Sequence, residues 1–184
     1  MRTHERPTSG ICDDCGYRFA PIGPTEAIAV LLDLPTVYRA ALNAPDDDLR
    51  RTTDADGWTA IEYAAHAAEV LHSTRKRLVL VFERDDRPVS PPHLEAVRAS
   101  ARGAQPELVL ASVSAACRDL AQLVGGVPDS VWDHTARIGD RTDGETLTAR
   151  ELLSDALHEA QHHALDARAV SGATTTGPVL LAPA

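Results

Sequence analysis

The segment His158-Glu-Ala-Gln-His162, followed at once by His163, contains the residues of this chain best suited to chemistry. Two histidines four positions apart on a helix lie one turn above each other, so both imidazoles can reach one cation. Neutral imidazole is also the commonest metal ligand in proteins. The string matches the HExxH pattern of zinc proteases, in which the glutamate, here Glu159, acts as general base. The sequence therefore predicts a metal site.

The zinc-protease interpretation fails further along the chain. One class of these enzymes needs a glycine three residues and a histidine six residues after its second histidine, where this chain has Leu165 and Arg168. Another class takes a glutamate ligand from a following helix, and no glutamate follows Glu159 in this sequence. A further ligand of the metal is therefore expected from upstream.

Composition and charge narrow the class of protein. The chain has 184 residues, 43% of them hydrophobic, which is enough for one domain with a single core. Its net charge of -9 argues against a nucleic-acid partner, because phosphate contacts need clustered Lys and Arg. The sequence has neither an apolar run of membrane-spanning length nor an apolar signal segment, so we expect a cytoplasmic protein without a membrane partner. Three cysteines, an odd number, do not form a disulfide framework.

Hydrophobic periodicity and end signals predict four helices, with approximate ranges 25–43, 59–83, 106–125 and 148–172. Thr25 is the expected N-cap of the first helix, which Pro35 should kink or shift. Loops are expected in the Pro-rich stretch 84–105 and, hairpin-like, in 139–144. We divide the chain into an N-terminal CxxC segment (1–24), a bundle (25–172) and a flexible tail (173–184).

Two connections suggest how the helices are ordered in space. The first and second helices are joined by about fifteen residues and the second and third by about twenty, against the two to eight usual between bundle helices. A crossover between parallel neighbours needs such a length, because the chain must travel back along the bundle. We therefore predict an all-α fold, a four-helix bundle of up-down-down-up order, with the second and third helices parallel.

His66, in the second predicted helix, is the upstream histidine that could complete the metal site. It lies at the edge of a broad apolar arc among small residues, which would let another helix approach closely. The alternative is a half-buried histidine that is hydrogen-bonded to a carbonyl group. Periodicity allows both interpretations.

A resemblance to a known family adds to this pattern. Trp58 at a helix start, His66 eight residues later and the late His158-Glu-Ala-Gln-His162-His163 string resemble the DinB/YfiT-like superfamily of metal-binding bundles, over residues 25–171. That family includes mycothiol- and bacillithiol-dependent transferases and the mycothiol-dependent maleylpyruvate isomerase. The resemblance implies an up-down-down-up bundle whose metal is held by His66, His158 and His162.

The roles of two residues close to His158 and His162, namely His163 and Asp155, are considered separately. His163 lies about 100° round the helix from His162 and is expected to pack in the bundle or at its surface. Asp155 lies one turn before His158 on the same face. It could fix the tautomer of a ligand ring, or it could belong to a solvated helix face.

Cys12-Asp-Asp-Cys15-Gly16 has the form of a zinc knuckle, in which glycine permits the tight turn that points backbone N–H groups at sulfur. Cys12 and Cys15 supply two ligands of a possible second metal site, and His4, Cys117 or a histidine of the bundle could complete it. Redox chemistry and inert thiols are the alternatives. The residues after Cys15 look extended, so no helix start lowers its thiol pKa. Cys117 is most simply a core residue.

Two classes of function remain. In the first, the chain is an enzyme, a thiol S-transferase or isomerase, in which a divalent metal lowers the pKa of a bound thiol. Zn²⁺ is favoured, with Ni, Fe or Mn as alternatives. The partners would be an electrophile and a small-molecule thiol, for which the resemblance suggests mycothiol; no catalytic base is assigned, and a homodimer stays open. In the second class, the bundle senses metal or redox state without catalysis. In this case Cys12 or Cys15 would be a further ligand of the histidine-bound metal and would leave no coordination position for a substrate. Identifying the ligands of this metal would therefore distinguish the two classes.

Overall fold

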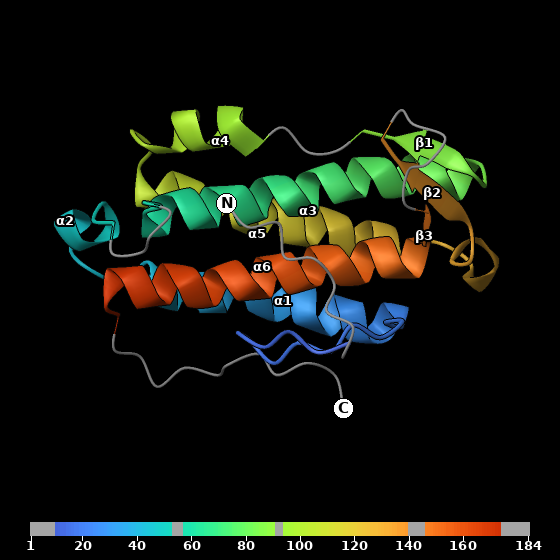
Figure 1. The fold of residues 1–184 in the computed structure, drawn as a ribbon, viewed down its shortest axis with the longest axis horizontal. Coiled ribbons are helices and arrows are strands. Elements are labelled where there is room, and N and C mark those ends of the chain that lie inside the picture. Colours follow the sequence, from blue (N-terminus) through green and yellow to red (C-terminus); the bar gives the residue numbers. More distant parts are fainter. Residues whose placement is uncertain (1–9, 53–56, 91–93, 140–145, 174–184) are drawn as a thin grey trace.

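Four long helices dominate the computed structural model, which describes residues 10–52, 57–90, 94–139 and 146–173 (Figure 1). They are α1 (Pro24–Ala41), α3 (Ala60–Glu83), α5 (Pro106–Gly125) and α6 (Ala149–Ser171). The shorter elements are α2 (Asp46–Leu49), β1 (Arg87–Val89), α4 (Leu94–Ala101), the 3-10 helix η1 (Asp129–Val131), β2 (Thr135–Ile138) and β3 (Thr146–Thr148). The four predicted long helices are thus confirmed, with ends that differ by a few residues.

The long helices form a four-helix bundle of up-down-down-up order. α1 and α6 run in one direction and α3 and α5 in the other (Figure 1). α1 and α3 each pack against both α5 and α6, so the parallel helices α3 and α5 are neighbours. The predicted fold class and helix order are confirmed.

Local sequence explains where α3 and α6 begin. Thr59 and Thr148 are their N-caps, and each closes a capping box: the threonine side chain accepts a hydrogen bond from the backbone N–H of Glu62 or Glu151, whose carboxylate accepts one from the threonine N–H. Each box satisfies two of the N–H groups that a helix start leaves without an intrahelical partner.

α1 begins one residue earlier than expected. Gly23 is the N-cap and Pro24 occupies the first helical position, so the prediction that Thr25 caps this helix is wrong. Proline suits that position because its φ is already helical and its missing N–H would have had no partner there. Pro35 lies inside the same helix without ending it.

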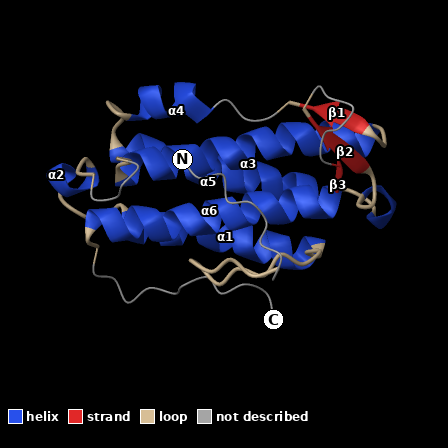
Figure 2. Cartoon of the chain, viewed as in Figure 1, coloured by secondary structure: helices blue, strands red, loops and turns tan. Residues whose placement is uncertain are grey.

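The connection between α3 and α5, expected as a loop, contains β1 and α4. β1 pairs in parallel with β2, and β2 pairs antiparallel with β3, which gives a small sheet of order β1-β2-β3. Figure 2 shows this sheet at the end of the bundle where α3 ends and α6 begins. β2 and β3 flank the hairpin-like loop expected at 139–144, of which residues 140–144 lie outside the described part of the chain. Except for residue 173, the predicted tail also lies outside it.

A buried carboxylate holds α4 against the start of α3. Glu62 is only 1% exposed, and its Oε1 accepts hydrogen bonds from Arg98 Nε at 3.4 Å and from Arg102 Nε at 3.1 Å. Arg98 also donates to the Gly57 carbonyl and lies over the Trp58 ring, 5.0 Å from its centroid. The ion pairs compensate the cost of burying the Glu62 charge, and they fix Trp58 at the start of α3.

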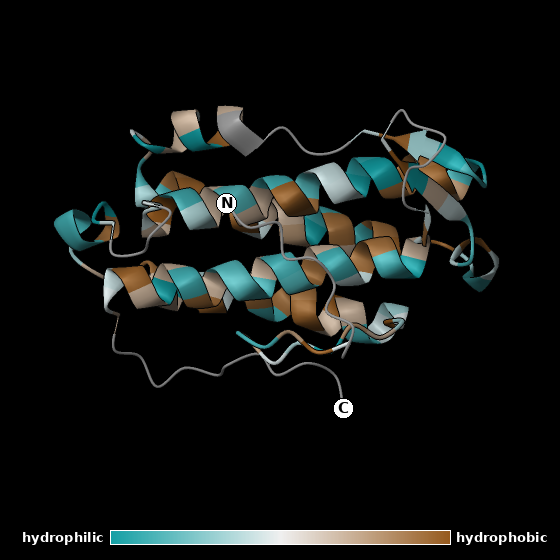
Figure 3. Cartoon of the chain, in the orientation of Figure 1, coloured by the Kyte–Doolittle hydropathy of each residue, from teal (hydrophilic) through white to brown (hydrophobic). Residues whose placement is uncertain are grey.

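The interior of the bundle contains large apolar side chains and a group of buried histidines. Each long helix carries both apolar and polar residues (Figure 3), and large apolar side chains such as Leu153 and Leu157 are fully buried. Tyr38 Oη donates to the Ala160 carbonyl at 2.6 Å, in the middle of α6. Beside this apolar core lie four buried histidines, His66, His158, His162 and His163. Such a concentration of buried imidazoles needs hydrogen-bond or metal partners.

Among the described helices, α5 alone is long and apolar enough to cross a membrane by length and composition. This is weak evidence, because the core helices of soluble proteins meet the same test. Here α5 packs against α1 and α3.

The capping box of α6 yields a prediction about stability. Replacing Thr148 with Ala should lower the free energy of unfolding by about 1 kcal/mol, because one N–H at the helix start loses its side-chain acceptor. Thr148→Ser keeps the hydroxyl and should retain most of this stability. Urea denaturation of metal-free protein measures both variants, and an equal loss in Ser and Ala variants would refute the capping role.

Candidate metal centres

α6 presents two overlapping pairs of potential ligands, His158 with His162 and Glu159 with His163. Each pair has the four-residue spacing that places two side chains on one helix face, and the two faces are about 100° apart. All three histidines of the helix are at least 95% buried, as is His66 on α3. One helix therefore supplies ligands to two separate groups.

The first group consists of His66 from α3 and of Glu159 and His163 from α6. Their ligand atoms all lie within 4.8 Å of one another. The Nε2 atoms of His66 and His163 both approach Glu159 Oε1, at 3.3 and 3.1 Å. Two imidazoles and one carboxylate are the ligand set of several catalytic zinc sites, which keep a further position for water or substrate.

A second carboxylate orients the His163 ring. Asp166 Oδ2 lies 2.9 Å from His163 Nδ1. When Nδ1–H donates to this carboxylate, the Nε2 lone pair is left to face Glu159 and His66. Such carboxylate–histidine pairs fix the tautomer and orientation of ligand histidines in metal sites. The residues of the first group therefore fit a divalent cation.

The three ionisable side chains of the first group shift one another's pKa values. Burial lowers the pKa of His163, but hydrogen bonds to Asp166 and Glu159 outweigh this and raise it to about 9. Burial raises the pKa of Glu159, yet His163 and His66 together hold it well below its ordinary value. Burial lowers the pKa of His66, with partial compensation from Glu159. The metal-free group is thus an ion pair that holds a proton on His163, and a divalent cation would displace this proton.

Aromatic rings from the start of α3 cover the two imidazoles of the first group. Trp58 packs edge-on against His66 with ring centroids 5.5 Å apart, and Tyr63 lies 5.2 Å from His163. Both aromatic side chains are buried. They limit the access of water to His66 and His163 from this side, and a low local dielectric strengthens the charge interactions of the group.

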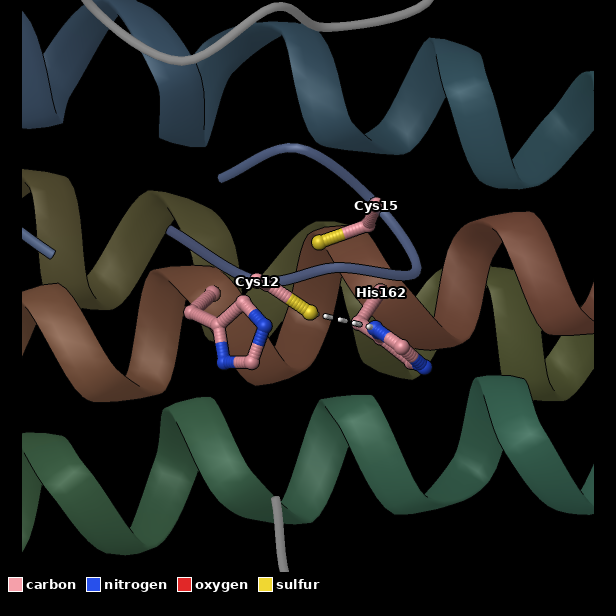
Figure 4. A group of neighbouring side chains, drawn as sticks. Cys12, Cys15 and His162 are labelled. Atoms are coloured by element: carbon pink, nitrogen blue, oxygen red, sulfur yellow. Dashed lines mark hydrogen bonds between the residues drawn. The ribbon is translucent and has the colours of Figure 1, made fainter. Parts of the chain in front are cut away.

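The second group consists of Cys12, Cys15, His158 and His162, whose ligand atoms also lie within 4.8 Å of one another. Cys12 Sγ is 3.7 Å from His162 Nδ1. Figure 4 shows both cysteines on the N-terminal segment beside α6, with the sulfur of Cys12 directed toward His162. Segments separated by about 150 residues therefore meet at one point.

The structure divides the three-histidine set that the sequence suggested. His158 and His162 do lie together, but with Cys12 and Cys15, whereas His66 lies with Glu159 and His163. The reason is the helical rotation of about 100° per residue, because the α6 ligands grouped with His66 lie one residue later. Cys117 is 1% exposed, which confirms it as a core residue, and His4 lies outside the described residues.

Glu159, His163 and Asp166 are the residues that the sequence reasoning did not assign to a site. Their signal was present: Glu159 and His163 have the same spacing as the two histidines of the HExxH string, and Asp166 follows His163 by one turn. The sequence left Asp155 open between orienting a ligand ring and belonging to a solvated helix face. In the structure Asp166 lies against His163 Nδ1.

A cavity of about 510 Å³ lies between α3, α4 and α5. Its polar lining includes Glu69 and His72 from α3 and Asp119 from α5. No residue of the two groups lines it. This cavity is therefore distinct from both candidate metal centres.

Comparisons with known proteins agree with the fold described above. The chain matches the DinB superfamily over residues 33–167. A comparison with curated proteins found no match. Among solved structures, it is similar to YfiT from Bacillus subtilis, described as a probable metal-dependent hydrolase with an unusual four-helix bundle topology. The TM-score is 0.73 at 19% identity, with 81% of this chain and 86% of YfiT covered.

A second similar structure is the mycothiol-dependent maleylpyruvate isomerase, with a TM-score of 0.66 and 19% identity. The alignment covers 86% of this chain but 64% of the isomerase, so this chain spans less than two thirds of that enzyme. At these identities the two structures establish the shared fold. Since the family match extends over most of the chain and includes His66, Glu159 and His163, the chain belongs to the DinB superfamily.

Proposed function

We propose that this protein is a metal-dependent enzyme, a thiol S-transferase or isomerase, whose metal is held by His66, Glu159 and His163. The observation that carries the proposal is the approach of the His66 and His163 Nε2 atoms to one oxygen of Glu159, at 3.3 and 3.1 Å. This revises the three-histidine set suggested by the sequence and keeps the predicted role of His66. Zn²⁺ suits the ligand set best, and Ni, Fe or Mn also accept imidazole and carboxylate ligands.

The ligand count supports catalysis by the first group. Three protein ligands would leave a position for a small molecule, and a divalent ion there would lower the pKa of a bound thiol, so that thiolate forms near neutral pH. Asp166 would hold the Nδ1 proton of His163 and keep the ring in its ligating orientation. Trp58 and Tyr63 would exclude water from the covered side of the imidazoles.

The co-substrate is proposed to be a low-molecular-weight thiol, with mycothiol as the first candidate. Its support is the fold that the chain shares with the mycothiol-dependent isomerase. A thiolate could attack an electrophile and remain attached, which is S-transfer, or add and leave again, which is isomerisation. Both reactions use the same thiol activation, so the assay must follow thiol consumption and substrate rearrangement separately.

A second candidate function is sensing of metal or redox state without catalysis. Its specific support is the position of Cys12 and Cys15 beside His158 and His162, which gives that group four protein ligands. A metal with four protein ligands has no position left for a substrate. The two candidate functions therefore depend on different groups, and variants of each group can be tested separately.

The enzyme proposal predicts that His66→Ala removes most of the thiol-dependent activity. The variant loses one of three proposed ligands, so metal at the first group should fall well below one ion per chain. His72→Ala is the matched control, since His72 lies on the same helix but in neither group. Activity is followed as consumption of mycothiol with a panel of electrophiles. Full activity in His66→Ala would contradict the proposal.

The first group should also bind metal more tightly as pH rises. Below a pH of about 9 the metal-free His163 carries a proton, which a cation must displace. One competing proton weakens the apparent affinity by about tenfold for each pH unit below that pKa. We expect this slope between pH 6.5 and 8.5 for Zn²⁺ binding to Cys12→Ser/Cys15→Ser, measured by chelator competition. An affinity that does not change with pH would show that His163 is not a ligand.

A further inference from the structure

We infer that Cys12, Cys15, His158 and His162 form a second metal site of the structural zinc type, which fastens the N-terminal segment to α6. This site goes beyond the proposed activity, and its ligands differ from the proposed catalytic ligands His66, Glu159 and His163. The sequence suggested the two cysteines but left their partner ligands open. The structure brings the HxxxH pair of α6 to them.

The ligand types and their spacing match this class of site. Two thiolates and two imidazoles are a common tetrahedral zinc set, and such sites pair cysteines two to four residues apart with histidines three to five residues apart. Here the cysteines are separated by two residues and the histidines by three. One potential ligand atom from each residue lies within 4.8 Å of the others, which requires only small side-chain adjustments around an ion.

The backbone around the cysteines already has the form of a knuckle. The Cys12 N–H donates to the Tyr17 carbonyl at 2.9 Å, and the Gly16 N–H donates to the Cys12 carbonyl at 2.8 Å. Gly16 has φ of +74°, a conformation that a side chain would disfavour. The Tyr17 backbone N–H also donates to the Cys15 sulfur. This turn holds the two sulfurs on one side of the loop, as a metal knuckle does.

Three of the four residues of the second group are buried. Cys12, His158 and His162 are each less than 7% exposed, and Cys15 is half-buried. Tyr17 and Phe19 place their rings 5.2 and 4.5 Å from the His158 ring. Four protein ligands leave no coordination position for a substrate, so this ion would stabilise structure rather than take part in the reaction.

One carboxylate, that of Asp166, lies close to a histidine of each site. Asp166 Oδ2 lies 2.9 Å from His163 Nδ1 and 3.6 Å from His162 Nε2. The opposite nitrogen of His162, Nδ1, faces Cys12. Binding of an ion at Nδ1 would therefore fix the ring whose other nitrogen approaches Asp166. Asp166 is thus a positioning residue that both sites share.

Metal content of protein purified without an affinity tag or chelator tests this inference. We expect about two zinc ions per chain in the wild type and about one in both Cys12→Ser and His158→Ala. Cys117→Ser is the matched control, because this buried cysteine lies on α5 outside the group, and it should retain both ions. A wild-type content of two ions that Cys12→Ser leaves unchanged would overturn the inference.

Replacing the bound zinc with Co²⁺ shows which of the two sites a variant has lost. Thiolate-bound Co²⁺ gives sulfur-to-metal charge-transfer absorption, which should be present in the wild type and in His66→Ala but absent in Cys12→Ser. If the wild type shows this band and loses it in Cys12→Ser, but has no thiol-dependent activity, the second site stands and the proposed function falls. If the wild type lacks the band, the second site falls.

Cys15→His covers the case in which Cys12→Ser does not fold. Histidine is itself a zinc ligand, so Cys15→His should retain the second ion with a weaker charge-transfer band, whereas Cys15→Ala should lose the ion. Equal metal content in these two variants would overturn the inference. So would a Cys12–Cys15 disulfide without metal in protein isolated under non-oxidising conditions.

Discussion

The arrangement of this bundle depends on how α6 distributes its ligands over two faces. The consecutive residues His158 and Glu159, and again His162 and His163, point about 100° apart because of helix geometry. One pair meets α3 at His66, and the other meets the N-terminal segment at Cys12 and Cys15. A single helix can therefore serve two groups only if its position between these neighbours is fixed. The capping box at Thr148 and the hydrogen bond from Tyr38 to Ala160 contribute to that position.

Burying so many ionisable groups has a cost that the structure offsets in two ways. In the first group, the His163 charge is neutralised by Glu159 and Asp166, so the metal-free state is an internally paired cluster. In the second group, burial raises the pKa of Cys15 to about 12, so this thiol stays uncharged when no ion is bound. A cation would compete with a proton at His163 and would have to deprotonate thiols at the second group. The two groups should therefore respond differently to pH and to metal supply.

Helix positions and order could be predicted from the sequence because capping boxes, periodicity and connection length are local signals. Periodicity, end signals and the long connection before Pro106 were sufficient for the positions of α3, α5 and α6, whereas the capping box at Thr59 was found only in the structure. The small sheet was not predicted, because the pairing of Arg87 with Ala136 joins residues far apart in the chain. The HEAQHH string was recognised as a metal motif, but it contains two equivalent four-residue spacings. Which of them faces His66 depends on the rotation of α6, and that is a tertiary property.

Anomalous diffraction at the zinc absorption edge, from crystals of the untagged protein, tests the central claim most directly. The account predicts two peaks per chain. One should lie among His66, Glu159 and His163, and the other among Cys12, Cys15, His158 and His162. A single peak bound by His66, His158 and His162 would contradict it. That result would restore the three-histidine site suggested by the sequence and require α6 to rotate relative to α3.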